Sequence, residues 1–341
     1  MGVDLGDSIP REKIELEDIS NWTLAVDGYN TLYQFLAIIR GASGEHLKDS
    51  KGRVTSHISG LFYRNVNLLE LGIKLVYVFD GKPPELKAQE IEKRTAQRRQ
   101  ARDMYLKALQ AGDQVQARKY AEASTILRRD MVADAKQMLD AMGIPWVDAP
   151  SEGEAQASVM ASEGTVRAVA SQDHDSIIFG APILVRNVTI SGKRRLPSKG
   201  IVINVQPERI TLASVLEATG LTREQLVDFA ILLGTDFNPG GFEGIGPVKA
   251  LKFLKKYGSL EAVTELKEEL SKIDYGAIRN LYLNPPATRG VSPQWKPPDR
   301  ERIISLLVDE HSFSLDRVQA ALGRIQSAQV SKSETLEKWF G

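Results

Sequence analysis

Residues 22–30, WTLAVDGYN, decide the fold, because five residues typical of a buried strand run directly into an aspartate and a glycine. Two further stretches repeat this pattern: Lys74–Phe79 is followed by Asp80, and residues 167–171 are followed by Asp173 and Asp175. Short, β-branched apolar runs that alternate with helical patterns favour an α/β fold with a mostly parallel sheet. Ligands of such sheets bind beyond the carboxyl ends of the strands, so three strands direct acids to one edge.

The remaining patterns indicate a central, mostly parallel sheet with helices on both faces. Residues 183–188 and 201–205 form a weaker pair of strands around the basic turn 191–199. Residues 85–142 are charged, contain no proline and are helical in pattern. From residue 206 onward the pattern is helical, apart from a proline-rich loop at 284–298.

Composition excludes several classes of protein. The 341 residues contain 44 Lys and Arg against 44 Asp and Glu, so any contact with nucleic acid must come from local basic patches. No apolar run approaches the roughly 20 residues of a membrane span, and the first residues do not have the pattern of a signal peptide. We therefore expect a cytoplasmic protein without a membrane partner. The lack of cysteine excludes disulfides, thiolate metal sites and cysteine nucleophiles.

The acids at the strand ends predict a metal site. Any one of these aspartates could simply begin a turn, but three repeats of the pattern make that explanation insufficient. Asp173 and Asp175 are two residues apart, so in an extended chain both side chains point to one side. Carboxylates held so close repel each other unless one is protonated or a cation lies between them. Magnesium or manganese suits such oxygen ligands and also suits phosphate chemistry.

Three more acids extend this set. Glu152 and Glu154 lie in PSEGEAQA, where Ser151 and Glu154 have the spacing of a helix capping box, so a purely structural role is a real alternative. Asp236 follows a glycine that ends a predicted helix. Carboxylates without histidine or cysteine partners argue against zinc. They fit two-metal phosphoryl chemistry, in which ions about 3.5–4 Å apart activate water and stabilise the leaving oxygen.

Six motifs in one order, AVDGYNTLYQFL, VFDGKPPELK, DAPSEGEAQA, SQDHDSIIFG, LLGTDF and GIGPVKA, resemble the flap endonuclease family, especially its archaeal members. The resemblance spans nearly the whole chain. It implies a 5′ flap endonuclease, with 5′–3′ exonuclease activity, that hydrolyses DNA at flap bases during replication and repair. It also implies two magnesium ions, replaceable by manganese, held by seven acids: Asp27, Asp80, Glu152, Glu154, Asp173, Asp175 and Asp236.

The same resemblance assigns residues that contact the substrate. Lys87 and Arg94 match positions that reach the scissile phosphate from the base of a helical arch, here at about residues 85–129. A cation there would stabilise charge that develops in the transition state. Tyr33 matches an aromatic position that stacks on a base. Without the resemblance, a solvated helix face and a core tyrosine are the simpler interpretations.

The motif GIGPVKA, residues 244–250, predicts the turn of a helix–hairpin–helix element at about residues 228–260. Glycines let the backbone approach phosphate, and amides at the start of the next helix favour an anion. We expect Gly244, Gly246, Lys249 and Lys252 to bind the DNA backbone without reading sequence. An ordinary helix connection is the alternative. The resemblance also implies a possible potassium ion in this turn.

The last residues, 327–341, resemble a sliding-clamp-binding tail. Leu336, Trp339 and Phe340 fit as apolar plugs, whereas Ser333 stands where the motif has glutamine. A disordered tail with incidental aromatic residues is the alternative.

We therefore expect one nuclease domain, residues 1–326, followed by this tail, in a monomer that acts on branched DNA. The basic extension that follows the clamp motif in nuclear relatives is missing, which favours a prokaryotic-type cytoplasm. Three rivals stay open: a related 5′ exonuclease or a junction or bubble endonuclease, a non-catalytic DNA-binding clamp adaptor, and an RNA-cutting enzyme.

Overall fold

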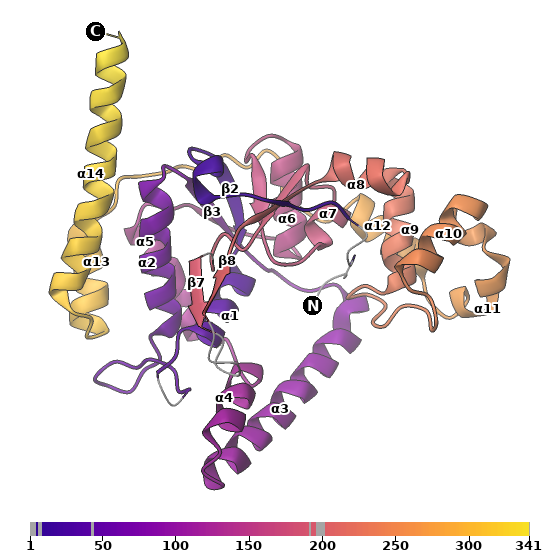
Figure 1. The fold of residues 1–341 in the computed structure, drawn as a ribbon, viewed down its shortest axis with the longest axis horizontal. Helices are drawn as coiled ribbons and strands as arrows, with labels where there is room; N and C mark the ends of the chain where they lie inside the picture. Colours follow the sequence, from indigo (N-terminus) through magenta and orange to yellow (C-terminus); the bar gives the residue numbers. More distant parts are fainter. Residues whose placement is uncertain (1–4, 6–8, 42–43, 191, 196–201, 341) are drawn as a thin grey trace.

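A computed structural model of the chain contains a seven-stranded sheet in the order β1-β9-β6-β5-β2-β3-β4 (Figure 1). It describes residue 5 and residues 9–41, 44–190, 192–195 and 202–340, with side chains outside residues 193–195, 202–203 and 329–340. The five strands from β6 to β4 are parallel, whereas β9 is antiparallel to its neighbours β6 and β1. The bounds are β1 Glu12–Lys13, β2 Thr23–Asp27, β3 Lys74–Phe79, β4 Trp146–Asp148, β5 Ala168–Ala170, β6 Ile183–Arg186 and β9 Glu208–Thr211.

Helices cover both faces of this sheet, as predicted, because side chains alternate along each strand. Val76 and Val78 of β3 belong to a core with residues of α6 (Gly153–Ser162) and α9 (Arg223–Leu233). Leu75, Tyr77 and Phe79 of the same strand belong to a second core on the opposite face. The helices of that second core are α1 Gly28–Ile38, α2 Ser56–Glu70, α5 Arg129–Ala141 and α14 Leu315–Phe340.

The order of the strands creates a switch point between β2 and β5. After β2 the chain continues to β3 and β4 on one side, and it then returns to form β5 on the other side of β2. The connections beyond the carboxyl ends of β2 and β5 therefore run in opposite directions and leave a crevice between them. This crevice lies at the end of β2 that was predicted to carry the site.

The charged stretch 85–142 is helical but broken twice. It contains the short 3-10 turn Glu85–Lys87, α3 Ala88–Gln110, α4 Gln114–Ala123 and α5. Gly112 adopts a left-handed conformation (φ 71°) that ends α3, and Asp113 caps α4 by accepting a hydrogen bond from the Gln116 amide. Figure 1 shows α3 and α4 leaning away from the sheet as a helical hairpin. None of the helices in the described part of the chain combines the length and apolarity needed to cross a bilayer.

Three expectations for the strands need correction. The segment after residue 206 is not wholly helical, because β9 pairs with β6 and β1 and buries Ile210 against the sheet. Strand β8, Val202–Val205, pairs with β7, Gly192–Arg195, inside the segment predicted as a turn, rather than with residues 183–188. Strand β4 was missed because only three residues pair with β3.

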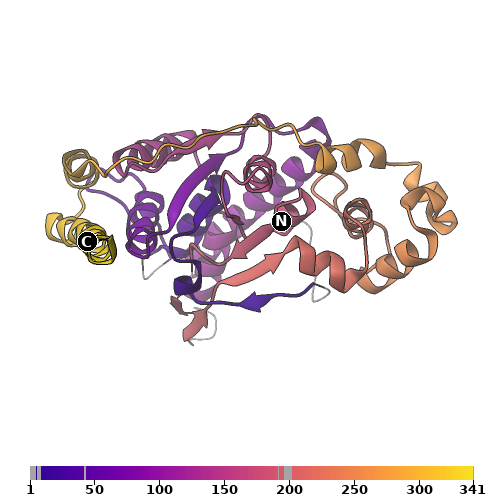
Figure 2. The same ribbon diagram turned by 90° about the horizontal axis from the view of Figure 1, so that it is seen from above.

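The C-terminal half contains the helices α8 Leu212–Thr219, α9, α10 Pro247–Tyr257, α11 Lys267–Leu270 and α12 Tyr275–Leu283. An extended segment, residues 284–299, then leads to α13 Arg300–Ile304, the π-helix Ser305–Glu310 and α14. We call this segment the strap, because it crosses the molecule from α12 to α13 (Figure 2). It is held by hydrogen bonds from the Trp295 indole to Leu75 O (2.9 Å) and from the Lys296 amide to Gly143 O (3.0 Å). The predicted proline-rich loop is thus confirmed.

Candidate metal and nucleic-acid site

The acids of β2 and β3 lie where predicted, at the carboxyl ends of their strands. Asp27 ends β2 and is also the N-cap of α1, where its carboxylate accepts a hydrogen bond from the Asn30 amide (3.0 Å). Asp80 follows β3 and accepts a hydrogen bond from the Gly153 amide (2.6 Å) at the start of α6. This bond brings Asp80 beside Glu152, the N-cap residue of α6.

The expected capping box at Ser151 is wrong. Glu152, not Ser151, is the N-cap residue, and its side chain makes no capping hydrogen bond. Glu154 instead accepts a hydrogen bond from the Ser171 hydroxyl (2.6 Å), which links α6 to the end of β5. Neither glutamate side chain therefore takes part in the helix capping that was the structural alternative.

Asp173 and Asp175 do not lie in extended chain, contrary to the expectation. Residues 172–174 bend and turn, and Asp175 begins the short helix α7, Asp175–Ile178. Asp175 is only 4% exposed, whereas Asp173 is partly exposed and accepts a hydrogen bond from the Asn30 side-chain amide (3.4 Å). Both carboxylates nevertheless act on the same neighbour, because each raises the pKa of Glu154.

Asp236 joins the group from the C-terminal half. It follows α9, which Gly234 ends with a φ of 103°. The carboxylate is buried, accepts a hydrogen bond from Arg94 (2.7 Å) and forms an ion pair with Lys87 (3.0 Å). Lys87 also forms an ion pair with Glu152, so it bridges acids at the start of α6 and after α9.

The seven acids, Asp27, Asp80, Glu152, Glu154, Asp173, Asp175 and Asp236, are called the carboxylate cluster here. Every member except Glu154 alters the pKa of another member or of a common neighbour, and the pKa of Glu154 is itself raised by three of the others. Burial, reinforced by Asp80 and Asp173, raises the pKa of Asp27 to about 8. Burial, followed by Asp173, Asp175 and Asp27, holds the pKa of Glu154 well above its usual value.

Burial and the neighbouring carboxylates thus disfavour the charged forms of Asp27 and Glu154. A divalent cation would favour those charged forms, and an all-oxygen donor set is the kind that magnesium and manganese prefer. Among the described residues, however, no group of three or more acidic or histidine side chains is arranged closely enough to hold an ion as it stands.

Cations from α3 and from the 3-10 turn before it lie against Glu152 and Asp236. Glu152 and Asp236 hold the pKa of Lys87 above its usual value, although burial alone would lower it. Arg94 is held between Asp236 and Glu90, whose carboxylate lies 2.8 Å from the Arg94 Nε. The Arg98 guanidinium lies over the ring of Tyr33, 4.7 Å from its centre. Tyr33 is partly exposed, so it is not the fully buried core tyrosine of the alternative.

The predicted phosphate-binding turn connects α9 to α10. Gly244 has a φ of 70°, and Gly246 is the N-cap of α10, whose first residue is Pro247. The amides at the start of α10 thus face an exposed surface beside Val248, which is 84% exposed. Lys249 and Lys252 are exposed on the same helix, and the Lys249 Nζ approaches Gly244 O at 3.5 Å.

The predicted clamp-binding residues lie in the last turns of α14. That helix continues to Phe340, so the backbone of Leu336, Trp339 and Phe340 is helical. Their side chains lie outside the described residues.

Two residues of the site were missed from the sequence. Asn30 contacts both Asp27 and Asp173, and Ser171 contacts Glu154. Asp27 and Asn30 have the spacing of an N-cap and its third helical residue, which was a usable signal. Ser171 carries no such signal, because its partner is distant in the sequence.

Comparisons with known proteins agree with this geometry. The XPG N-terminal domain family matches residues 7–101, and the XPG I-region family matches residues 143–236. Flap endonuclease 1 of Pyrococcus abyssi is 51% identical over 341 residues, which cover 100% of this chain and 98% of the relative. Flap endonuclease 1 of Caldivirga maquilingensis is 52% identical over 350 residues, which cover both chains completely.

A solved structure agrees as well. Flap endonuclease-1 from Methanococcus jannaschii superposes with a TM-score of 0.75 at 39% identity, over 97% of this chain and 100% of the other. The α/β fold predicted from the sequence is thereby confirmed, and so is the resemblance. This chain belongs to the flap endonuclease family.

Proposed function

We propose that this chain is a structure-specific 5′ flap endonuclease with 5′–3′ exonuclease activity. It would hydrolyse phosphodiester bonds at the base of flaps that arise in lagging-strand synthesis and long-patch repair. The observation that carries the proposal is the meeting of seven carboxylates at the switch point of the sheet, with Lys87 and Arg94 against them. The full-length identity of about half to flap endonucleases supports the same activity.

The family is one of metal-dependent nucleases, and we propose two magnesium ions here, with manganese as a substitute. The carboxylate cluster would hold them, because it contains seven oxygen-donor side chains, and burial together with neighbouring carboxylates raises the pKa of Asp27 and Glu154. When bound, the ions supply an activated water and neutralise charge on the reacting phosphate.

Lys87 and Arg94 are proposed as catalytic cations. In the free protein they neutralise Glu152 and Asp236, so entry of metal frees them to contact the scissile phosphate. A preorganised cation at that point stabilises the charge that develops as the bond breaks. Tyr33 would stack on a base once Arg98 leaves its ring.

The turn between α9 and α10 is proposed to hold the duplex. Gly244 and Gly246 leave the backbone open to a phosphate, and Lys249 and Lys252 add charge on an exposed face. A potassium ion in this turn is part of the proposal, since carbonyl oxygens of a tight turn can bind a weakly hydrated cation.

Residues 327–341 are proposed as a tail that binds a sliding clamp, while residues 1–326 form the nuclease domain with its arch at about 85–129. Figure 1 shows the later turns of α14 extending away from the sheet, where a partner could reach them. We propose a monomer that works on the chromosome in a prokaryotic-type cytoplasm.

The decisive experiment uses end-labelled 5′-flap DNA beside single-stranded, duplex, bubble and four-way-junction DNA. Each substrate is incubated with magnesium, with chelator, and with the Asp175→Ala variant. Magnesium-dependent cutting at the flap base that the substitution abolishes is the expected result. Equal cutting of all substrates would replace the proposal with a general exonuclease. Tight flap binding without cutting would indicate a DNA-binding adaptor.

A further inference from the structure

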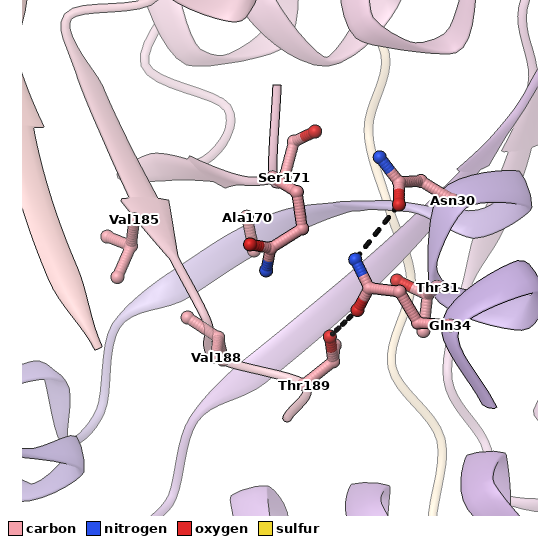
Figure 3. Close-up of a pocket in the computed structure, with 9 residues that line it drawn as sticks. Asn30, Thr31, Gln34, Ala170, Ser171, Val185, Val188 and Thr189 are labelled. Carbon is pink, nitrogen blue, oxygen red and sulfur yellow. Dashed lines mark hydrogen bonds between the residues drawn. The ribbon is translucent and has the colours of Figure 1, made fainter. Parts of the chain in front are cut away.

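Figure 3 shows two hydrogen bonds that link Thr189, Gln34 and Asn30, and a third bond continues this line from Asn30 to the carboxylate cluster. The Thr189 hydroxyl donates to the Gln34 carbonyl oxygen (3.0 Å), and the Gln34 amide nitrogen donates to the Asn30 carbonyl oxygen (2.9 Å). The Asn30 amide nitrogen then donates to Asp173 Oδ2 (3.4 Å). Thr189 lies after β6, whereas Asn30 and Gln34 lie one turn apart on α1.

These three side chains border a small cavity rather than a binding pocket. This cavity has a volume of about 10 Å³, which is room for about one water molecule. Its walls include Val185, Val188 and Ala170, and Thr189 itself is only 8% exposed. The polar atoms of the line are thus bonded to protein neighbours beside a cavity too small for a substrate group.

The direction of the bonds is fixed from the Asp173 end, because an ionised carboxylate can only accept. The Asn30 nitrogen must therefore face Asp173, and the Asn30 oxygen must face the Gln34 nitrogen. The Gln34 oxygen then faces Thr189, whose hydroxyl donates to it and so holds the Gln34 amide in this orientation. If the Asn30 amide turned over, its oxygen would face the carboxylate, which is repulsive.

Asn30 is also tied to a second acid. Its backbone amide donates to Asp27 Oδ1 (3.0 Å), so one residue fixes carboxylates from β2 and from the end of β5. These two acids flank the switch point of the sheet. The orientation of Asn30 thus sets how the two carboxylates face each other.

We propose that Asn30, Gln34 and Thr189 are positioning residues that orient the Asp173 carboxylate for metal binding. This inference rests on the proposed magnesium site. Partners that orient a ligand from behind commonly change metal affinity by 10–100-fold when they are removed. The hydroxyl of Thr189, although it touches no acid, acts through two amides on the affinity of the site.

The test compares Thr189→Val with Thr189→Ser in the full chain. Manganese binding to the free protein is measured by the electron paramagnetic resonance of unbound Mn²⁺, and cleavage of a 5′ flap is measured against magnesium concentration. We expect Thr189→Val to weaken Mn²⁺ binding about tenfold and to raise the magnesium requirement equally, with the rate at saturating magnesium nearly unchanged. Thr189→Ser keeps the donor and should bind Mn²⁺ like the unaltered protein.

Two controls separate orientation from packing. Thr165→Val removes a threonine hydroxyl that donates to Val291 O (3.4 Å) under the strap, and it should leave Mn²⁺ binding unchanged. In an Asp173→Asn background, Thr189→Val should have no further effect, because its target is gone. Equal losses in the valine and serine variants, or an undiminished effect in the Asp173→Asn background, would overturn the proposal.

The outcomes also distinguish this inference from the proposed function. If the unaltered protein neither binds Mn²⁺ nor cuts flaps, the proposed function fails. If it does both and Thr189→Val binds Mn²⁺ normally, only the positioning role fails. Thermal unfolding of each variant shows that folding is intact in every comparison.

Discussion

At the scale of single residues, the free protein balances its acids with its own cations. Lys87 and Arg94 pair with Glu152 and Asp236, while burial and neighbouring carboxylates raise the pKa values of Asp27 and Glu154. We expect metal to bind first beside Asp27 and Glu154, because a cation would favour their charged forms most.

Replacement of Lys87 tests its proposed contact with phosphate. Lys87→Ala should slow single-turnover cleavage at saturating magnesium by about 10²–10³-fold, the usual effect of removing one group that stabilises transition-state charge. Flap binding, measured by fluorescence anisotropy with calcium in place of magnesium, should change little. Lys82→Ala alters an exposed lysine in the same loop and should be nearly normal. A loss of binding as large as the loss of rate would make Lys87 a binding residue only.

The strand-end acids could be found from sequence because a parallel sheet brings every strand end to one edge. The local backbone conformation and the hydrogen-bond partners of these acids could not be predicted from sequence. The turn at residues 172–174 and the bond from Ser171 to Glu154 depend on β5 and α6 meeting in space, and no spacing within either segment encodes that contact.

At the scale of elements, the strap ties the two halves of the chain together through backbone contacts. Gly143, between α5 and β4, has a φ of 68°, and a Cβ atom there would lie 2.0 Å from Lys296 O. Any side chain at residue 143 therefore pushes the strap away. The strap is held here by a few hydrogen bonds and by the anchored indole of Trp295, rather than by packing of one helix on another.

Gly143→Ala should therefore destabilise the protein more than a glycine replacement that causes strain alone. Gly164→Ala is the matched control, because Gly164 has a φ of 77° but its Cβ would meet nothing within 4 Å. The control should cost about 1–2 kcal/mol from the left-handed backbone. Gly143→Ala should cost at least about 1 kcal/mol more, since the bond from Lys296 is lost. Urea unfolding measures both, and equal losses would contradict the anchoring role.

The turn before α10 offers a replacement that separates stability from binding. Gly246 has a φ of −95°, and its Cβ would meet nothing within 4 Å, so Gly246→Ala should fold normally. The new methyl group would stand where a phosphate must approach the α10 amides, so duplex affinity should fall about tenfold or more, as for one lost charge-assisted hydrogen bond.

Titration of duplex DNA against each protein checks this expectation. Gly323→Ala, on α14, is a control with equal space around its Cβ. A Gly246→Ala variant that folds and binds duplex normally would remove this turn from the proposed DNA contacts.

Elements were predictable where the pattern was long and repeated. β3 was predicted residue for residue, and the helical character of α3 to α5 was clear from composition. β9 and β4 were missed because each is short and gains its stability from pairing with a distant strand, which local pattern does not reveal.

At the scale of the whole molecule, we expect protons and metal ions to compete for the same buried carboxylates. Folding raises the pKa of Asp27 to about 8, so the folded protein keeps a proton that the unfolded chain releases near its ordinary value of 3.8. Stability falls with rising pH wherever the folded state binds more protons than the unfolded state. His46, whose pKa burial lowers to about 4 from 6.5, acts in the opposite direction, but only below pH 6.5.

Between pH 6.5 and pH 8, the free energy of unfolding should therefore decrease in chelator. Magnesium should flatten or reverse this decrease, because it binds the deprotonated cluster and stabilises only the folded protein. Urea unfolding at several pH values, with and without magnesium, measures the effect. The Asp27→Asn variant should lose much of the slope in chelator. An identical slope in that variant would show that another group titrates.

The core that contains α14 receives its last residues near the end of the chain. Val318, Leu322 and Ile325 of α14 pack in the same core as Leu24 of β2 and Tyr77 of β3, whereas the last acid of the carboxylate cluster is Asp236. A growing polypeptide on the ribosome therefore displays every acid before it has the helix that closes one face of the sheet. We expect translation itself to delay activity until the finished chain is released, so that nascent chains carry the complete set of acids without the power to cut.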